Sequence, residues 1–536
     1  MWDTRNATIA NCRLFTGDDC LAGAYWENVT VTNCILNTSC NAFRVGGRNV
    51  LVNNCLIYGP GQYEHRTSAR KNLGSGFQIL PHRRSPRGPG RLVEEGPVDN
   101  IILSNIAMHN VRSPVWIAFD PDAPYSQDNL GVGRIIIQNL TVTGAGKTPF
   151  YVAGPAERPA RSIVLRNVRM TFAGGANEAM ADGQGFSPYS ILQAYGFYFR
   201  NVEHAEMHDV RVDYQEKDLR PALFGQNLGT LELDRFVPAR EPEGPPPLLF
   251  AGIRKMLRDG GEVSILKVPV RSVEVNTPTV HAGERFSMTA EMAPANGPGL
   301  AEVSVTVGSE PVARTAWLEP ERPARVRFVN LAAPEAGEVA IQADQFTGRL
   351  AVHPRPEGRP VAAPFIAFAN TKAVMEQLDS GFYIRSGGDA AILDRADQYG
   401  AVYLEDAFPP HGEVVVKVEN PDVATSWAGR AGIMVRNDIA RPGESRGYLI
   451  LGSSPANGSS LEWDSDGDGR IDQRTELDGY TLWPHWLKLE RRGAEFAGYS
   501  SVDGTNWSKV GQARISGTER FLDVSIFTHL RSARFS

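Results

Sequence analysis

A short repeated unit with an asparagine at its centre runs through the first part of the chain. Each unit is a run of β-branched residues, a polar turn residue and a second short run. The turn residues are Asn11, Asn33, Asn54, Asn105, Asn139, Asn167 and Asp209. Two strands per coil that bend at an asparagine predict a right-handed parallel β-helix, with asparagine side chains hydrogen-bonded from coil to coil. A β-sandwich has turns every 8 to 12 residues or so and lacks this fixed register.

All five cysteines lie within this repeat region, at positions 12, 20, 34, 40 and 55. Cys12, Cys34 and Cys55 each directly follow a repeat asparagine, so the repeat predicts that they form one buried stack of small apolar side chains. A disulfide framework would be spread through the whole fold, and the Cys-x-x-Cys spacing of metal sites is absent from the sequence.

The overall composition excludes some classes of partner. The 55 Lys and Arg residues against 61 Asp and Glu give a net charge of -6, which argues against nucleic acid as the main partner. No apolar run reaches the roughly 18 residues that a membrane span needs, so none is expected. At 536 residues the chain is too long for one domain. We expect a monomer of several domains.

Composition and strand spacing divide the chain into modules. We expect the β-helix over residues 1–240 and a proline-rich linker over 241–262. Short strands at hairpin spacing in 263–354 predict an immunoglobulin-like β-sandwich, for which the sequence suggests a spacer role. A second linker, 355–362, precedes a last module over 363–536.

The last module contains segments that resemble a known type of β-sandwich module. Gly381–Arg385, Ala431–Arg436 and Trp486–Arg491 are similar to segments of the concanavalin-like jelly-roll modules of secreted bacterial proteins. Alternating apolar and polar residues in its strands fit a sandwich with one solvated face. Together the three modules predict an all-β chain, in which a right-handed parallel β-helix is followed by an immunoglobulin-like β-sandwich and a concanavalin-like jelly-roll β-sandwich.

Paired carboxylates follow a glycine in Thr16-Gly17-Asp18-Asp19-Cys20. An isolated Asp-Asp pair is commonly a solvated turn, but here it stands between two coils of the repeat. Gly-Asp-Asp-Cys in this context resembles the polygalacturonase-type glycoside hydrolases of family twenty-eight. The resemblance implies that Asp18 is the general acid and that Asp19 is one of two carboxylates that activate water, in an inverting hydrolysis.

The chain departs from that family at three points. A third Asp, expected about one coil earlier, would precede Met1, so we expect an N-terminally truncated chain and hold Asp3 as a weak substitute. Asn41 stands where the family has a histidine, with Arg44 shortly after it. An Arg-Ile-Lys motif is replaced by a loop with Arg66, Arg70 and Lys71. The secreted family implies that the whole protein is secreted, periplasmic or on the cell surface.

Several further residues are candidates for substrate binding. His65, Arg66, Arg70 and Lys71 lie in a long insertion and would suit an acidic sugar, although a solvated basic loop has the same composition. With Asn41 and Arg44 they form the predicted substrate site. Tyr195 and Arg220 belong to segments that recur in related β-helix proteins, where they either contact sugar or cap the last coils.

A calcium loop is predicted in the last module. Oxygens of Asp464, Asp466 and Asp468, the backbone carbonyl of Arg470 and the carboxylate of Asp472 follow the Asp-x-Asp-x-Asp-Gly spacing. Position 12 is a threonine, with Glu476 one residue beyond. An acidic hairpin tip is the alternative. The Ca2+ would be structural, and no cofactor is expected for catalysis.

The sequence therefore predicts a glycoside hydrolase acting on an acidic or plant or algal polysaccharide. Two alternatives stay open. A non-catalytic carbohydrate-binding or adhesion protein would explain the missing histidine and third Asp. A polysaccharide lyase on the same scaffold would need a basic Arg or Lys near calcium instead of the Asp pair.

Overall fold

The part of the chain that the structure describes is built from β-strands alone. The computed structural model describes residues 3–65, 71–79, 98–118, 131–154, 156–176, 192–277, 279–387, 397–419, 429–454, 458–477, 485–529 and 531–536. Every regular element in these ranges is a strand, β1 to β38, so the all-β prediction is confirmed for them. None of these residues lies in a helix long and apolar enough to cross a membrane.

The chain forms two compact units. The first comprises Met1–Pro278, Ser287–Val329 and Glu338–Leu350, and the second comprises Thr279–Phe286, Asn330–Gly337 and Ala351–Ser536. The domain boundaries predicted from composition stay predictions.

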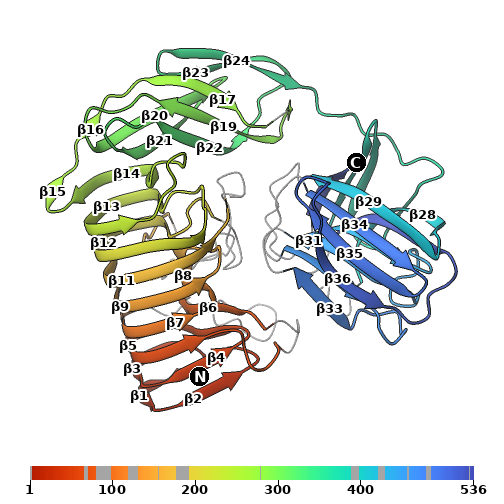
Figure 1. Ribbon diagram of the computed structural model, residues 1–536, viewed down its shortest axis with the longest axis horizontal. Coiled ribbons are helices and arrows are strands. Elements are labelled where there is room, and N and C mark those ends of the chain that lie inside the picture. Colours follow the sequence, from red (N-terminus) through yellow and green to blue (C-terminus); the bar gives the residue numbers. More distant parts are fainter. Residues whose placement is uncertain are drawn as a thin grey trace. The chain divides into compact units, whose positions relative to one another are not determined.

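The first unit contains a stack of strands that pair in parallel, drawn in red to yellow-green in Figure 1. In sequence order each strand pairs with one from the next repeat, as β1 with β3, β3 with β5, β5 with β7 and β7 with β9. The bounds are β1 Arg5–Ala10, β2 Arg13–Thr16, β3 Leu21–Thr32, β4 Ile35–Thr38, β5 Asn41–Tyr58, β6 Leu73–Ile79, β7 Asp99–His109, β8 Val111–Ala118, β9 Arg134–Ala145, β10 Phe150–Ala153, β11 Ser162–Gly174, β12 Phe197–Glu216, β13 Leu223–Pro238 and β14 Leu248–Arg258.

Inward side chains of this stack form one apolar core. Alternate residues such as Val29, Val50, Ile101 and Ile135 lie in register on neighbouring strands and are all almost fully buried. Successive strand residues point to opposite faces, so β-branched residues at alternate positions supply a continuous core along the stack.

The asparagine register is observed as a hydrogen-bonded ladder. Asn33 Nδ2 donates to Asn11 Oδ1 at 3.2 Å and Asn54 Nδ2 to Asn33 Oδ1 at 2.8 Å, and Asn139 and Asn167 continue the series at 2.8 and 2.9 Å. These asparagines have φ between 50° and 57°, the left-handed region that asparagine tolerates better than β-branched residues do. The predicted bend is therefore confirmed, and the predicted ladder is confirmed from Asn11 to Asn54 and from Asn105 to Asn167. Between these two runs Asn105 donates to Asn53 in place of Asn54, and after the second run Asp209 pairs with Arg169.

The predicted cysteine stack is also observed. Cys34 and Cys55 are buried and Cys12 is partly buried, and all five cysteines are free thiols. Burial raises the pKa of the Cys55 thiol to about 11, which keeps it protonated and unreactive at neutral pH.

Short antiparallel strands follow the stack. β20 pairs with β21, and β17, β19 and β22 form a three-stranded sheet. The bounds are β15 Gly261–Glu262, β16 Ile265–Leu266, β17 Val270–Val275, β18 Val280–His281, β19 Arg285–Met292, β20 Gly299–Val307, β21 Glu310–Leu318, β22 Ala324–Ala332, β23 Gly337–Ala343 and β24 Phe346–His353. The predicted change from parallel to antiparallel pairing is confirmed, and the immunoglobulin-like class stays a prediction.

The second unit holds two seven-stranded antiparallel sheets, in the orders β25-β28-β37-β30-β31-β32-β33 and β26-β27-β38-β29-β34-β35-β36. Ile433 and Leu451 of the first sheet and Leu487 and Phe496 of the second belong to one buried cluster. The bounds are β25 Ile366–Ala369, β26 Ala373–Leu378, β27 Gly381–Ser386, β28 Gly400–Phe408, β29 His411–Glu419, β30 Arg430–Arg436, β31 Leu449–Ser454, β32 Gly458–Trp463, β33 Gln473–Leu477, β34 His485–Arg492, β35 Glu495–Ser501, β36 Ser508–Arg514, β37 Leu522–His529 and β38 Arg531–Phe535.

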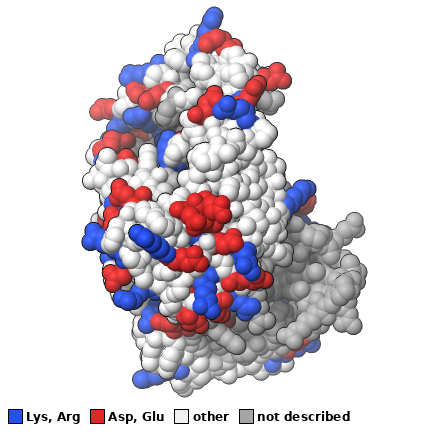
Figure 2. All heavy atoms as spheres, turned by 90° about the vertical axis from the view of Figure 1, so that its right-hand side faces the viewer, with Lys and Arg blue, Asp and Glu red and all other residues white. Residues whose placement is uncertain are grey.

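Surface charges of both signs are intermixed. Figure 2 shows acidic and basic side chains interspersed over the face that it draws. This distribution agrees with the small net charge of -6, and on that face it gives no single-sign field of the kind that attracts nucleic acid.

Candidate functional site

The Asp18–Asp19 pair lies in the turn between β2 and β3, and the backbone of this turn is held on two sides. The hydroxyl groups of Thr16 and of the buried Thr38 both donate to the carbonyl oxygen of Asp18. A Cβ atom on residue 17 would overlap the carbonyl oxygen of Glu64, so only glycine allows this close approach. The Gly17 of the motif thus fixes the position of the carboxylates against the chain that follows β5.

Asp19 is the more enclosed carboxylate, with 9% of its side chain exposed. Asn41 Nδ2 donates to Asp19 Oδ1 at 2.7 Å, and the buried Ser75 donates to Asn41 Oδ1 at 2.6 Å. Arg44 Nη1 lies 3.7 Å from the other oxygen, Asp19 Oδ2. Three successive coils therefore contribute to one hydrogen-bonded chain, Ser75 to Asn41 to Asp19, which fixes the orientation of the Asp19 carboxylate.

Asp18 projects into solvent, with 71% of its side chain exposed. His65 Nε2 lies 3.8 Å from Asp18 Oδ1, and the backbone N–H of Asp19 donates to the same oxygen at 2.8 Å. Partial burial raises the pKa of Asp18. Hydrogen bonds from the Asp19 N–H and the Cys40 thiol and the charges of His65 and Arg44 outweigh that effect, so the pKa stays below its ordinary value.

The predicted substrate residues thus divide into those that the structure brings to the carboxylates and those that it does not. Asn41, Arg44 and His65 contact Asp18 or Asp19 directly. Lys71 instead pairs with Glu64 at 3.4 Å, on the surface.

The remaining basic candidates, Arg66 and Arg70, lie outside the described residues. Asp3, held as a weak substitute for the third Asp, donates its backbone N–H to the carbonyl oxygen of Ala24. Ala24 lies in β3, after the turn that carries Asp18 and Asp19.

Tyr195 and Arg220 are buried inside the stack, which corrects the prediction that they contact sugar. Arg220 forms a two-pronged pair with Asp218 at 3.0 and 2.9 Å, and its Nη1 donates to the carbonyls of Lys147 and Ala194. The Tyr195 hydroxyl donates to the carbonyl of Ala239 at 2.6 Å. Both side chains satisfy backbone groups between coils, so the capping alternative accounts for them.

The predicted calcium loop follows β32. Asp464 is fully buried, and its Oδ1 and Oδ2 accept the N–H groups of Gly467 and Gly469 at 2.7 and 2.8 Å. One oxygen from each of Asp464, Asp466 and Asp468 lies within 4.8 Å of the others. Burial raises the pKa of Asp464 and outweighs these backbone hydrogen bonds, with a smaller contribution from Asp466.

The two outer carboxylates predicted as ligands, Asp472 and Glu476, have protein partners instead. Both oxygens of Asp472 accept hydrogen bonds from Ser465, at 2.8 Å from its N–H and 2.6 Å from its hydroxyl. Glu476 pairs with Arg474 at 3.0 Å. The Arg470 N–H donates to Asp468 at 2.8 Å.

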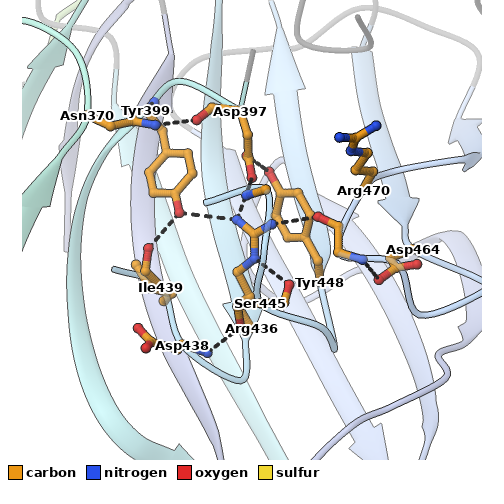
Figure 3. Close-up of polar contacts among 12 residues, drawn as sticks. Asn370, Asp397, Tyr399, Arg436, Asp438, Ile439, Ser445, Tyr448, Asp464 and Arg470 are labelled. Atoms are coloured by element: carbon orange, nitrogen blue, oxygen red, sulfur yellow. Dashed lines mark hydrogen bonds and ion pairs between the residues drawn. The ribbon is translucent and has the colours of Figure 1, made fainter. Parts of the chain in front are cut away.

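A buried arginine anchors the same loop (Figure 3). Arg436 Nη2 donates to the carbonyl of Gly469 at 2.7 Å, and its Nη1 pairs with Asp397 at 2.5 Å. The guanidinium carbon lies 3.8 Å from the ring centroid of Tyr448, whose hydroxyl donates to Asp397 at 2.7 Å. This closed network fixes one side of the acidic loop without using its carboxylates.

Comparison with known proteins gives only distant similarities. No family model matches the chain. Among solved structures it is similar to the Bacteroides ovatus xyloglucan PUL GH43B, with 8% identity and a TM-score of 0.22, over 52% of this chain and 68% of that one. It is also similar to the enzymatically active domain of bacteriophage CBA120 tailspike protein 2, with 9% identity and a TM-score of 0.19, over 99% and 71%.

The full-length form of that tailspike protein, from an Escherichia coli O157:H7 bacteriophage, has 8% identity and a TM-score of 0.18, over 96% of this chain and 67% of that one. TM-scores this low establish neither fold nor activity for this chain. The polygalacturonase-type resemblance stays a prediction.

Proposed function

We propose that the chain is a carbohydrate-active enzyme that hydrolyses glycosidic bonds at the Asp18–Asp19 turn of a right-handed parallel β-helix. The observation that carries the proposal is the turn itself. Its backbone is locked by Thr16, Thr38 and Gly17, and its two carboxylates differ in exposure and in partners. Glycoside hydrolysis needs two carboxyl groups in unlike environments, one to protonate the leaving oxygen and one to activate water.

The electrostatics support an exchange of the roles expected from the sequence. A general acid must carry a proton at the working pH, whereas the pKa of Asp18 is held below its ordinary value. Asp18 is therefore the better base for water, and its exposure gives water access. This assigns the general-acid role to the other carboxyl group of the pair, the enclosed Asp19, whose side chain Asn41 orients.

Acidic substrates are supported by exposed cations near the pair. Arg44 has 47% of its side chain exposed beside Asp19, and a guanidinium group can bind a uronate carboxylate through two hydrogen bonds. Lys71, which pairs with Glu64 and not with the acidic pair, is half exposed and is a second proposed contact for an acidic sugar.

The test is a panel of uronate-containing and neutral polysaccharides, assayed for new reducing ends. With the substrate so identified, Asp18→Asn and Asp19→Asn should each lower kcat/KM by about 10²–10⁴-fold, the usual contribution of a general acid or base. An aryl glycoside with a good leaving group separates the roles, because its departure needs no acid. On it Asp19→Asn should recover much of its activity and Asp18→Asn should not.

Full activity in both variants would show that the reacting groups lie elsewhere. The reverse pattern on the aryl glycoside would restore Asp18 as the acid. The anomer first formed, read by NMR, tests the expected inversion.

A second candidate function is carbohydrate binding without catalysis. It is favoured by Asn41, an amide that satisfies Asp19 but carries no charge and transfers no proton. Retention on a polysaccharide gel with no new reducing ends would support this function and exclude the first for that polysaccharide.

We also propose that Asp464, Asp466 and Asp468 bind a structural Ca2+ in a secreted protein. Three carboxylate oxygens within 4.8 Å repel one another, and a hard cation relieves that repulsion. Added Ca2+ should raise the thermal unfolding midpoint, and Asp466→Asn should remove the increase. Glu476→Gln should not remove it, because Glu476 already pairs with Arg474.

A further inference from the structure

Beside the acidic pair, three metal-binding groups of different chemistry converge. One ligand atom from each of Asp18, Cys40 and His65 lies within 4.8 Å of the other two. They come from three separate segments, the β2–β3 turn, the residue before β5 and the chain after β5. We propose that these residues form a binding site for a divalent transition-metal cation of the zinc class.

The donor set selects the class of metal. A thiolate and an imidazole beside one carboxylate suit Zn2+ and its neighbours in the first transition row, whereas Ca2+ and Mg2+ take oxygen ligands. This distinguishes the site from the all-carboxylate loop at Asp464.

The geometry is close to that of a metal centre. With bonds of about 2.0 to 2.3 Å, two ligands of a tetrahedral zinc ion lie about 3.5 Å apart. His65 Nε2 and Asp18 Oδ1 are already 3.8 Å apart. The Asp18 side chain is mostly exposed, so it can rotate to shorten this distance to the one that a metal ion requires.

Burial leaves one side of the site open. Cys40 is 8% exposed and the His65 side chain 14%, while Asp18 is 71% exposed. Three protein ligands with an accessible fourth position are typical of zinc sites that hold water or another small ligand.

Neighbouring groups support the sulfur as a ligand. The N–H of Cys40 donates to Thr38 Oγ1 at 3.1 Å, which fixes its backbone. Asn41 Nδ2 lies 3.4 Å from Cys40 Sγ, as a donor that suits a thiolate. A cation at this point would also balance the adjacent carboxylates Asp18 and Asp19.

The experiment is a metal titration of the whole chain, freed of metal by a chelator that is then removed. Co2+ serves as the probe, because a cobalt–thiolate bond gives a near-ultraviolet charge-transfer band that an oxygen-only site lacks. We expect about one equivalent of Co2+ to develop this band and Zn2+ to abolish it by displacement. The background variant Asp466→Ala removes competition from the acidic loop.

Variants identify the ligands. Cys40→Ser should abolish the band and His65→Asn should weaken Co2+ binding at least about 10-fold, while the matched control Cys12→Ser should bind like the wild type. His65→Asn keeps the test valid if Cys40→Ser does not fold, which circular dichroism would reveal.

No band at millimolar Co2+, or an unchanged band in both Cys40→Ser and His65→Asn, would overturn the proposal. The titration uses no substrate, so its failure leaves the hydrolase proposal intact, and absence of hydrolysis leaves the metal site intact. A bound metal would occupy the Asp18 carboxylate proposed as the base, so hydrolysis is assayed on the metal-free chain.

Discussion

Two clusters of neighbouring carboxylates in this molecule, at the Asp18–Asp19 turn and at the Asp464 loop, are stabilised by different groups. At the Asp18–Asp19 turn, side chains from other segments, namely Asn41, Arg44 and His65, contact the carboxylates in addition to the Asp19 N–H. At the Asp464 loop, the carboxylate is held by backbone N–H groups of its own loop, from Gly467 and Gly469.

The pKa values of the two carboxylates are shifted in opposite directions. The pKa of Asp18 is lowered and that of Asp464 is raised. An exposed turn in which the Asp19 N–H, the Cys40 thiol and two cations face Asp18 keeps a charged group available for chemistry. A loop that buries its carboxylate stores unfavourable charge that a cation can relieve.

The largest expected contrast is in stability. Asp464→Ala should lower the free energy of unfolding by about 2–5 kcal/mol, because the N–H groups of Gly467 and Gly469 lose their acceptor inside the protein. Asp18→Ala, at an exposed side chain, should cost about 1 kcal/mol or less. Urea unfolding measures both. Asp464→Asn, which keeps one acceptor oxygen, should recover part of the loss, and equal costs at the two sites would contradict the contrast.

A second prediction concerns the relay to Asp19. Asn41→Ala should cost about 1–3 kcal/mol, since the buried Ser75 hydroxyl loses its acceptor, and should also lower kcat/KM on the substrate found. Adding Ser75→Ala should restore much of the stability, because both polar partners are then gone. It should not restore activity, because Asp19 still lacks its amide donor. Joint recovery would show that Asn41 acts only in folding.

The pH dependence of stability should have opposite signs at the two clusters. The ordinary pKa of an aspartate is about 3.9. The folded pKa of Asp18 lies lower, so its stabilisation is present above about pH 3.9 and is lost as the pH falls through the folded value. The folded pKa of Asp464 is raised, so its contribution is present below about pH 3.9 and is lost as the pH rises through the folded value.

Urea unfolding from about pH 3 to 6, with a chelator present, should therefore show Asp18→Asn and Asp464→Asn diverging from the wild type in opposite directions. Parallel profiles would refute the comparison.

The smallest effect is expected at Lys71. Its pair with Glu64 is half exposed on both sides, so Lys71→Met should change the free energy of unfolding by less than about 0.5 kcal/mol. If the substrate is acidic, KM should rise while kcat stays nearly constant. A neutral analogue of the substrate is the control and should show no change in KM.

The sequence predicted the parts of this molecule that depend on short-range order. The asparagine spacing predicted the parallel stack and its ladder, and the Asp-x-Asp-x-Asp-Gly run predicted that Asp464, Asp466 and Asp468 would converge. The acidic run lies within one loop, where the spacing along the chain fixes the distance in space, and the asparagines recur at the same point of each coil, so stacking the coils brings them together.

The partners of the acidic pair were only partly predictable. Asn41 was aligned with a missing histidine, but the structure places the imidazole of His65, from a later segment, beside Asp18. Ser75 and Cys40 were not recognised as part of the site. Ser75 lies 34 residues after Asn41, beyond an insertion, so no spacing rule connects them. The stacked rings of Trp116 and Tyr151, with centroids 3.9 Å apart, lacked a sequence signal for the same reason.

A second ladder of asparagines, formed by Asn6, Asn28, Asn49 and Asn100, indicates which changes in chain length this protein can accept. Asn49 bonds to Asn28 across 21 residues at 3.0 Å, and Asn100 bonds to Asn49 across 51 residues at 2.9 Å. The same hydrogen bond therefore forms between successive coils whether 21 or 51 residues separate the two asparagines. The thirty additional residues between Asn49 and Asn100 leave this ladder unbroken, whereas losing one residue within a strand would bring a β-branched side chain to a position with φ near +50°. Evolution can thus lengthen the turns around the site freely while the strands behind it stay fixed in length.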